Sequence, residues 1–86
     1  MRPYLSRFLY EHSTTVELSM LVDGFVSVKI YNLMGQLVTT LHEGNLIGSE
    51  NNYSFIWDAT DSASGIYLVK AEANGFTEMQ KLMLVK

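Results

Sequence analysis

Hydrophobic and polar residues alternate along most of the chain from Thr14 onward. Val16, Leu18 and Met20 alternate with polar neighbours in the first such segment. The same pattern returns in the segments 25–33, 37–44, 53–58, 65–73 and 76–86. Successive side chains of a β-strand point to opposite faces of its sheet, so the pattern predicts strands with one buried face. No segment after Thr14 has the spacing of a convincing amphipathic helix, and we expect an all-β protein.

Turn-forming residues separate the predicted strands. Asp23-Gly24 and Asn74-Gly75 are pairs that favour tight hairpins, because glycine adopts positive φ without steric cost. Each pair predicts that the strands on either side of it are antiparallel neighbours. Met34-Gly35-Gln36 and the cluster 59–65 mark two further turns. Segment 43–52 is mostly polar, and we expect a loop or a poorly formed edge there.

Several short strands between such turns predict a β-sandwich of about seven strands. We expect one domain over residues 14–86, and a leader, a linker or a first edge strand over residues 1–13. The apolar residues of that first segment are also spaced as in a helix, so a short helix is an alternative there. Tyr53, Phe55 and Trp57 lie two residues apart, so they share one strand face, which we expect to anchor the core.

Composition argues against several functions. A net charge of −3 with only six scattered Lys and Arg residues gives no basic patch for nucleic acid or for a membrane surface. The chain has no cysteine, and therefore neither disulfides nor thiolate metal sites. No apolar run approaches the length of a membrane span. Residues 1–10 lack the apolar stretch of a signal peptide, so a secreted form would carry that signal on a larger precursor.

Candidate chemistry is sparse. His12 and His42 are the two histidines, and neither has a partner at metal-ligand spacing. Asp58 and Asp61 with Glu50 could offer oxygens to calcium, but such residues in turns more often bind local backbone. We therefore predict no enzyme, with no catalytic residue, cofactor or metal.

The segment 81–86, KLMLVK, resembles a core strand more than a polar tail. Terminal residues are usually frayed and polar, so we expect this segment to be held in place or to be recognised. Alternation places Leu82 and Leu84 toward the core, and Met83 and Val85 on the other side. Fold stability would then explain one face only, and we expect the other face to be exposed.

Several short groups of residues have a family pattern in common. These groups are Ile30-Tyr31-Asn32, Gly35-Gln36, Trp57-Asp58, Ala63-Ser64-Gly65-Ile66-Tyr67 and Lys81-Leu82-Met83-Leu84-Val85-Lys86. In this order they resemble the C-terminal sorting domain of the type IX (Por) secretion system and the similar Ig-like domain of flagellar hook-capping proteins. The resemblance covers about residues 14–86. The short turn 58–65 favours the sorting domain, whereas residues 2–12 replace the Asn-Pro-Phe-Asn-Pro-like opening that is common in the family.

The resemblance implies an Ig-like antiparallel β-sandwich at the C-terminus of a larger secreted or cell-surface protein. In that family the domain is a non-catalytic export signal, which the outer-membrane type IX translocon recognises and a peptidase usually cleaves. The cargo, fused on the N-terminal side, is expected to pass through the periplasm and then to be secreted or held at the cell surface. The outer-membrane secretion machinery, its peptidase and the fused cargo are the expected partners.

Two sets of residues follow from the resemblance. Suspected translocon contacts are Gly75, Lys81, Leu82, Met83, Leu84, Val85 and Lys86. Fold-motif residues are Tyr31, Asn32, Gly35, Trp57, Asp58, Gly65 and Tyr67. In the second set the glycines permit unusual backbone conformations, Trp57 and Tyr67 supply core bulk, and Asn32 can close a turn through its amide.

The alternative function is a structural or adhesive Ig-like accessory module, including one that binds carbohydrate. That alternative predicts an exposed aromatic platform. The sorting function instead predicts that Tyr53, Phe55 and Trp57 are mostly buried.

Overall fold

A computed structural model describes residues 4–9, 13–20, 23–48, 51–73 and 75–84. These residues form seven strands and no helix. The strands are β1 (Tyr4–Leu9), β2 (Ser13–Met20), β3 (Gly24–Asn32), β4 (Leu37–Leu46), β5 (Asn51–Asp58), β6 (Gly65–Ala73) and β7 (Phe76–Leu84). No helix in the described ranges is therefore long and apolar enough to span a membrane.

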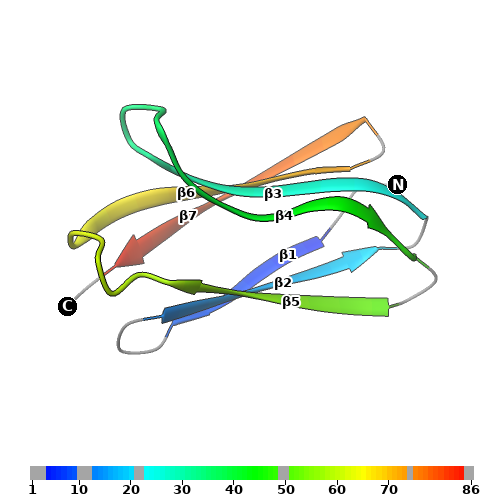
Figure 1. Cartoon of the computed structure of the whole chain (residues 1–86), viewed down its shortest axis with the longest axis horizontal. Helices are drawn as coiled ribbons and strands as arrows, with labels where there is room; N and C mark the ends of the chain where they lie inside the picture. Colours follow the sequence, from blue (N-terminus) through cyan, green and yellow to red (C-terminus); the bar gives the residue numbers. More distant parts are fainter. Residues whose placement is uncertain (1–3, 10–12, 21–22, 49–50, 74, 85–86) are drawn as a thin grey trace.

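The strands form two antiparallel sheets that lie one above the other (Figure 1). One sheet has the order β1-β2-β5, and the other has the order β4-β3-β6-β7. The prediction of an all-β antiparallel sandwich is confirmed. A short helix was one alternative for residues 1–13, but Tyr4–Leu9 form β1, an edge strand that pairs with β2.

Inward-facing side chains of both sheets fill the space between them. Among the residues whose side chains the structure describes, the core consists of Val16, Leu18, Val26, Val28, Ile30, Trp57, Ala59, Tyr67, Val69, Ala71, Ala73, Leu82 and Leu84. Every strand from β2 to β7 other than β4 contributes at least one of these residues, and β4 adds the partly buried Leu41 and Leu46. The predicted inward faces of β2 and β3 are thus confirmed for Val16, Leu18, Val26, Val28 and Ile30.

The hairpin predicted at Asp23-Gly24 is wrong. Strands β2 and β3 belong to different sheets, so the chain crosses the sandwich at this point instead of folding back on itself. The Asp23 carboxylate accepts a hydrogen bond from the Gly48 N–H at 2.7 Å. Gly48 lies in the β4–β5 connection, which also crosses between the sheets. Asp23 thus ties two crossing connections together, a role that the local sequence does not distinguish from a tight turn.

Strand β4 also departs from expectation. It continues to Leu46, so the first part of the expected loop is strand. Two register shifts interrupt its pairing with β3, between Val28 and Lys29 and between Ile30 and Tyr31. A bulge adds a residue to one strand and breaks the alternation of faces. Leu41 and His42, expected on opposite faces, are therefore both half-buried.

The hairpin predicted at Asn74-Gly75 is confirmed. Strands β6 and β7 pair antiparallel from Gly65 opposite Leu84 to Ala73 opposite Phe76. Gly75 has a φ of 79°, in the left-handed region that glycine tolerates. Asn74 lies outside the described residues.

Candidate recognition surface

Strand β7 has two chemically different faces. Leu82 and Leu84 are fully buried in the core. Between them, the side chain of Met83 is 53% exposed, and Lys81 is also exposed. The exposure expected for Met83 is thus present, whereas Val85 and Lys86 lie outside the described residues. Packing in the core therefore explains the leucines of this strand and does not account for Lys81 and Met83.

Lys81 and Met83 belong to the outer face of the four-stranded sheet. The strand registers place Lys81 opposite Leu68, Leu68 opposite Tyr31, and Tyr31 opposite Leu37. This outer row thus crosses all four strands of the sheet. Met83 lies opposite Ile66 in the next row. Among the described residues β7 pairs with β6 alone, so it forms an edge of this sheet.

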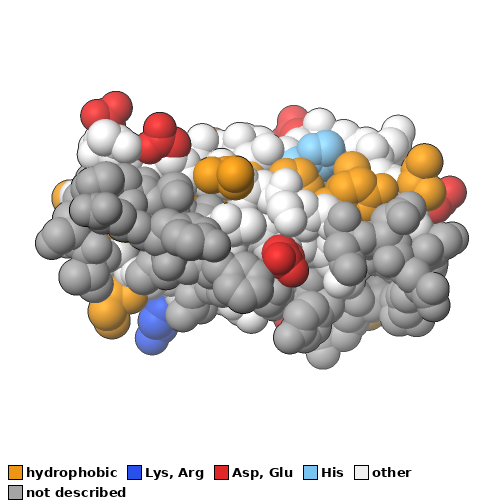
Figure 2. All heavy atoms as spheres, turned by 90° about the horizontal axis from the view of Figure 1, so that it is seen from below, with side chains coloured by type: hydrophobic (Ala, Val, Ile, Leu, Met, Phe, Trp, Pro, Cys, Tyr) orange, Lys and Arg blue, Asp and Glu red, His pale blue; other side chains and the backbone are white. Residues whose placement is uncertain are grey.

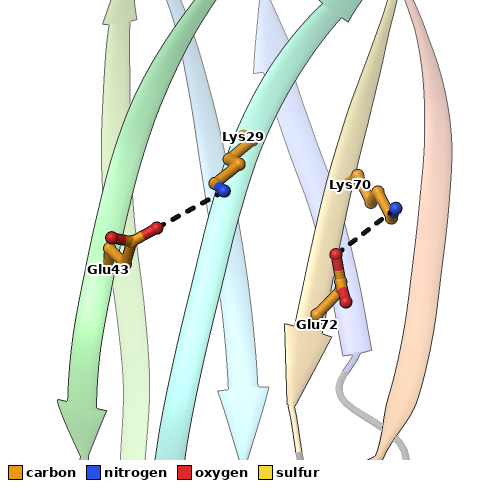
Figure 3. A network of polar contacts seen from close by, with 4 residues as sticks. All are labelled: Lys29, Glu43, Lys70 and Glu72. Atoms are coloured by element: carbon orange, nitrogen blue, oxygen red, sulfur yellow. Dashed lines mark ion pairs between the residues drawn. The ribbon is translucent and has the colours of Figure 1, made fainter. Parts of the chain in front are cut away.

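Two ion pairs occupy the middle of the same face (Figure 3). Lys29 Nζ lies 3.4 Å from a Glu43 carboxylate oxygen, and Lys70 Nζ lies 3.3 Å from one of Glu72. Exposed pairs of this kind contribute little to stability. They do neutralise the two lysines locally, whereas Lys81 has no ion-pair partner within the described part of the chain.

An open hollow lies on this face at the opposite end from Met83. Its lining includes Phe25 from β3, Phe76 from β7 and the Lys29–Glu43 pair. Neither Lys81 nor Met83 contributes to it. The hollow is therefore separate from the exposed end of β7.

The turn between β3 and β4 is built around Asn32. The Asn32 Oδ1 atom accepts hydrogen bonds from the N–H groups of Met34 at 2.9 Å and Gln36 at 3.0 Å. Its Nδ2 atom donates to Gln36 Oε1 at 2.9 Å. The Asn32 backbone also bonds with Gly35 and Gln36, and Gly35 has a φ of 81°. The side chain and the backbone of Asn32 therefore hold the turn together.

We expect Asn32→Ala to lower the free energy of unfolding by about 0.5–1.5 kcal/mol, because the turn loses two hydrogen bonds that are exposed to solvent. Urea unfolding of the purified domain measures this change. Asn32→Asp is the matched control, since it keeps the acceptor oxygen and loses only the Nδ2 donor. A similar loss in both variants would contradict the role assigned to Oδ1.

Aromatic residues join β5 to β6 inside the sandwich. The rings of Trp57 and Tyr67 make an edge-to-face contact with centroids 5.0 Å apart. The Tyr67 hydroxyl donates to the Ala63 carbonyl at 2.6 Å, which anchors the β5–β6 turn. Trp57 is buried, and Phe55 and Tyr53 are half-buried. This stripe therefore offers no exposed aromatic platform of the kind that the accessory-module alternative requires.

The acidic turn residues have local partners. The Asp58 carboxylate accepts hydrogen bonds from both the backbone N–H and the hydroxyl of Thr60. The part of the chain that the structure describes contains no group of three or more His, Asp or Glu side chains that could hold a metal ion.

His42 stacks near Phe55, with ring centroids 5.2 Å apart.

Sequence reasoning missed one exposed apolar group, at the tip of the β3–β4 hairpin. Leu33 is 65% exposed, Met34 is 81% exposed, and Leu37 at the start of β4 is also exposed. Turns usually carry Gly, Pro, Asn, Asp or Ser, so two large apolar residues beside Gly35 were the available signal. The sequence of Met34-Gly35-Gln36 predicts only a turn.

Comparison with known proteins matches residues 11–86 to the model of the secretion system C-terminal sorting domain. No curated protein and no solved structure matched the chain. The match does not show the expected similarity to hook-capping proteins. It favours the predicted sorting function over the accessory module, and the family is generally non-catalytic. The chain therefore belongs to the type IX C-terminal sorting domain family, whose members direct secreted proteins for export by the type IX secretion machinery.

Proposed function

We propose that the outer-membrane type IX translocon recognises the outward face of β7, with Lys81 and Met83 as direct contacts. Leu82 and Leu84 act indirectly, because their burial holds the strand in the position in which its other face is displayed. Gly75 permits the tight turn from which β7 begins. The observation that carries this proposal is the exposed Met83 between two fully buried leucines.

The chemistry of the two contacts suits protein recognition. Methionine is flexible and polarizable, so it adapts to an apolar surface of a partner. The ammonium group of Lys81 is available for an acidic group on that partner, since none of the described residues forms an ion pair with it. As an edge strand, β7 also lies where a partner strand could add to the sheet. We include Val85 and Lys86 in the proposed contact on the basis of the sequence alone.

The route of export follows the family. In this proposal a cargo domain precedes the sandwich, which comprises residues 14–86 together with the first edge strand β1. The cargo crosses the periplasm, and a peptidase of the machinery removes the sorting domain after export. Strand β1 begins and strand β7 ends at opposite ends of the sandwich (Figure 1). A cargo joined ahead of β1 would thus leave the end of β7 accessible.

Met83→Gln tests the contact directly. The chain is fused behind a fluorescent reporter with a periplasmic signal peptide, in a host that has type IX secretion. We expect the exported fraction to fall by about fivefold or more, as for loss of an interface anchor. The free energy of unfolding should change by less than about 0.5 kcal/mol, because the side chain is largely in solvent.

Ile56→Gln is the matched control. Ile56 is 68% exposed and lies on the outer side of β5 in the opposite sheet, where Figure 2 shows the described hydrophobic side chains in separate groups. Export should be unchanged in this variant. Equal export of the Met83→Gln and Ile56→Gln fusions would refute the proposed contact.

Deleting residues 82–86 is a weaker test than a point substitution. The deletion removes Leu82 and Leu84, which are fully buried, together with the exposed Met83. Loss of export would then follow from either unfolding or lost recognition. Single substitutions on the two faces of β7 separate these causes.

A further inference from the structure

The tip of the β3–β4 hairpin presents an apolar surface to solvent. Leu33 and Met34 occupy turn positions, and Leu37 begins β4 just beyond them. All three side chains are more than half exposed. Large apolar side chains that are exposed next to one another mark interaction sites more often than scattered ones do. We call Leu33, Met34 and Leu37 the hairpin patch.

The backbone that carries the hairpin patch is held in one conformation. Asn32 binds the N–H groups of Met34 and Gln36 and the side-chain oxygen of Gln36. A loop that is already ordered loses less conformational entropy on binding than a mobile one. The hairpin therefore presents Leu33 and Met34 from an ordered backbone, at a place where solubility alone would favour polar residues.

The hairpin patch lies at the same end of the sandwich as the exposed end of β7, across the width of the four-stranded sheet. Leu37 starts the outer row that runs through Tyr31 and Leu68 to Lys81. The hairpin bends away from the three-stranded sheet at the end of the sandwich where β7 also ends (Figure 1). Tyr31 and Leu68 are half-buried, so the row connects the hairpin patch to Lys81 by a partly apolar surface. The two exposed regions are parts of one face.

We propose that the hairpin patch is a second contact for the same component of the secretion machinery that recognises β7. That component would have an apolar cleft for Leu33 and Met34 beside the surface that contacts Lys81 and Met83. This inference rests on the proposed function of β7. Continuity of the outer row favours a single protein partner, because one surface can cover both ends of the row.

Chemistry argues against two other occupants. The hairpin patch has no hydrogen-bonding side chain with which to bind a sugar, since its members are leucine and methionine. A membrane surface would require a cluster of basic residues near the patch, but Lys29 and Lys70 are paired with glutamates on this face, which leaves Lys81 as the single lysine without an ion pair among the described residues. A second copy of the chain remains a distinguishable outcome of the tests below.

The first test replaces both tip residues, as Leu33→Gln with Met34→Gln, in the full chain fused to the secreted reporter. We expect the exported fraction to fall by about fivefold or more, with the unfolding transition unchanged. Ile47→Gln is the matched control, because Ile47 is 63% exposed in another connection of the chain and should tolerate the change. Export of the double variant at the level of this control would overturn the inference.

The second test identifies the partner. A photo-crosslinking amino acid replaces Met34, Met83 or Ile47 in the exported fusion. Positions 34 and 83 should crosslink to the same outer-membrane component, and position 47 to none. Crosslinking to that component from position 83 alone would overturn the hairpin contact while leaving the β7 contact intact. Crosslinking from neither position would overturn both, and crosslinking from position 34 to a second copy of the chain would assign the patch to self-association.

Discussion

Trp57→Ala should lower the free energy of unfolding by about 3–5 kcal/mol, the range for removing a buried aromatic side chain. The indole ring is buried in edge-to-face contact with Tyr67, which itself holds the β5–β6 turn through its hydroxyl group. The substitution leaves a cavity between the two sheets and removes this aromatic contact. Small domains have a total stability of about 5–15 kcal/mol, so the variant should retain only part of its fold stability.

Thermal and urea unfolding both measure this effect. Each kcal/mol corresponds to about 4–8 °C in the melting temperature of a domain of this size. Ile56→Ala is the control, since Ile56 precedes Trp57 on the same strand but faces solvent, and it should change stability by less than about 0.5 kcal/mol. Equal losses in the two variants would contradict the assignment of inward and outward faces in β5.

Leu82→Ala should lower the free energy of unfolding by about 2–5 kcal/mol. Leu82 is fully buried in the core although it lies on an edge strand near the end of the described chain. Its removal weakens the attachment of β7 to both sheets. Amide hydrogen exchange should show the largest loss of protection along β6 and β7, which pair with each other.

Met83→Ala is the control for Leu82→Ala. Met83 is the next residue of β7 and is largely in solvent, so unfolding should change by less than about 0.5 kcal/mol. A destabilisation as large as that of Leu82→Ala would mean that Met83 packs against the core. The division of β7 into a packed face and a displayed face would then be wrong.

Much of this fold was predictable because the relevant signals are local. The alternation around Val16, Val28 and Leu82 follows from the geometry of a single strand, and each of these residues is buried as expected. The Asn74-Gly75 hairpin was predictable for the same reason, since the turn and its two strands are adjacent in sequence.

Contacts between distant segments were not predictable in this way. Asp23-Gly24 has the composition of a hairpin turn, but Asp23 binds Gly48, which is 25 residues away. The alternating pattern of β2 and β3 is the same whether they pair in one sheet or face each other across the core. The bulges that place both Leu41 and His42 at the core likewise depend on the partner strand.

The recognition surface was predictable in part. Alternation placed Met83 opposite to the core face, and the structure shows its exposure. The hairpin patch was missed because a turn assignment says nothing about where its side chains lie relative to β7. Its relation to Lys81 depends on the order of four strands, which the sequence pattern does not specify.

The central claim is that neighbouring residues on opposite faces of β7 have different functions. The most direct test measures export of the Leu82→Ala and Met83→Gln fusions at a temperature at which both purified domains are folded. We predict that the exported fraction of Leu82→Ala stays near that of the unsubstituted fusion despite the lower stability of this variant. The exported fraction of Met83→Gln should fall by about fivefold or more although its stability is normal. Loss of export in folded Leu82→Ala, together with normal export of Met83→Gln, would contradict the claim.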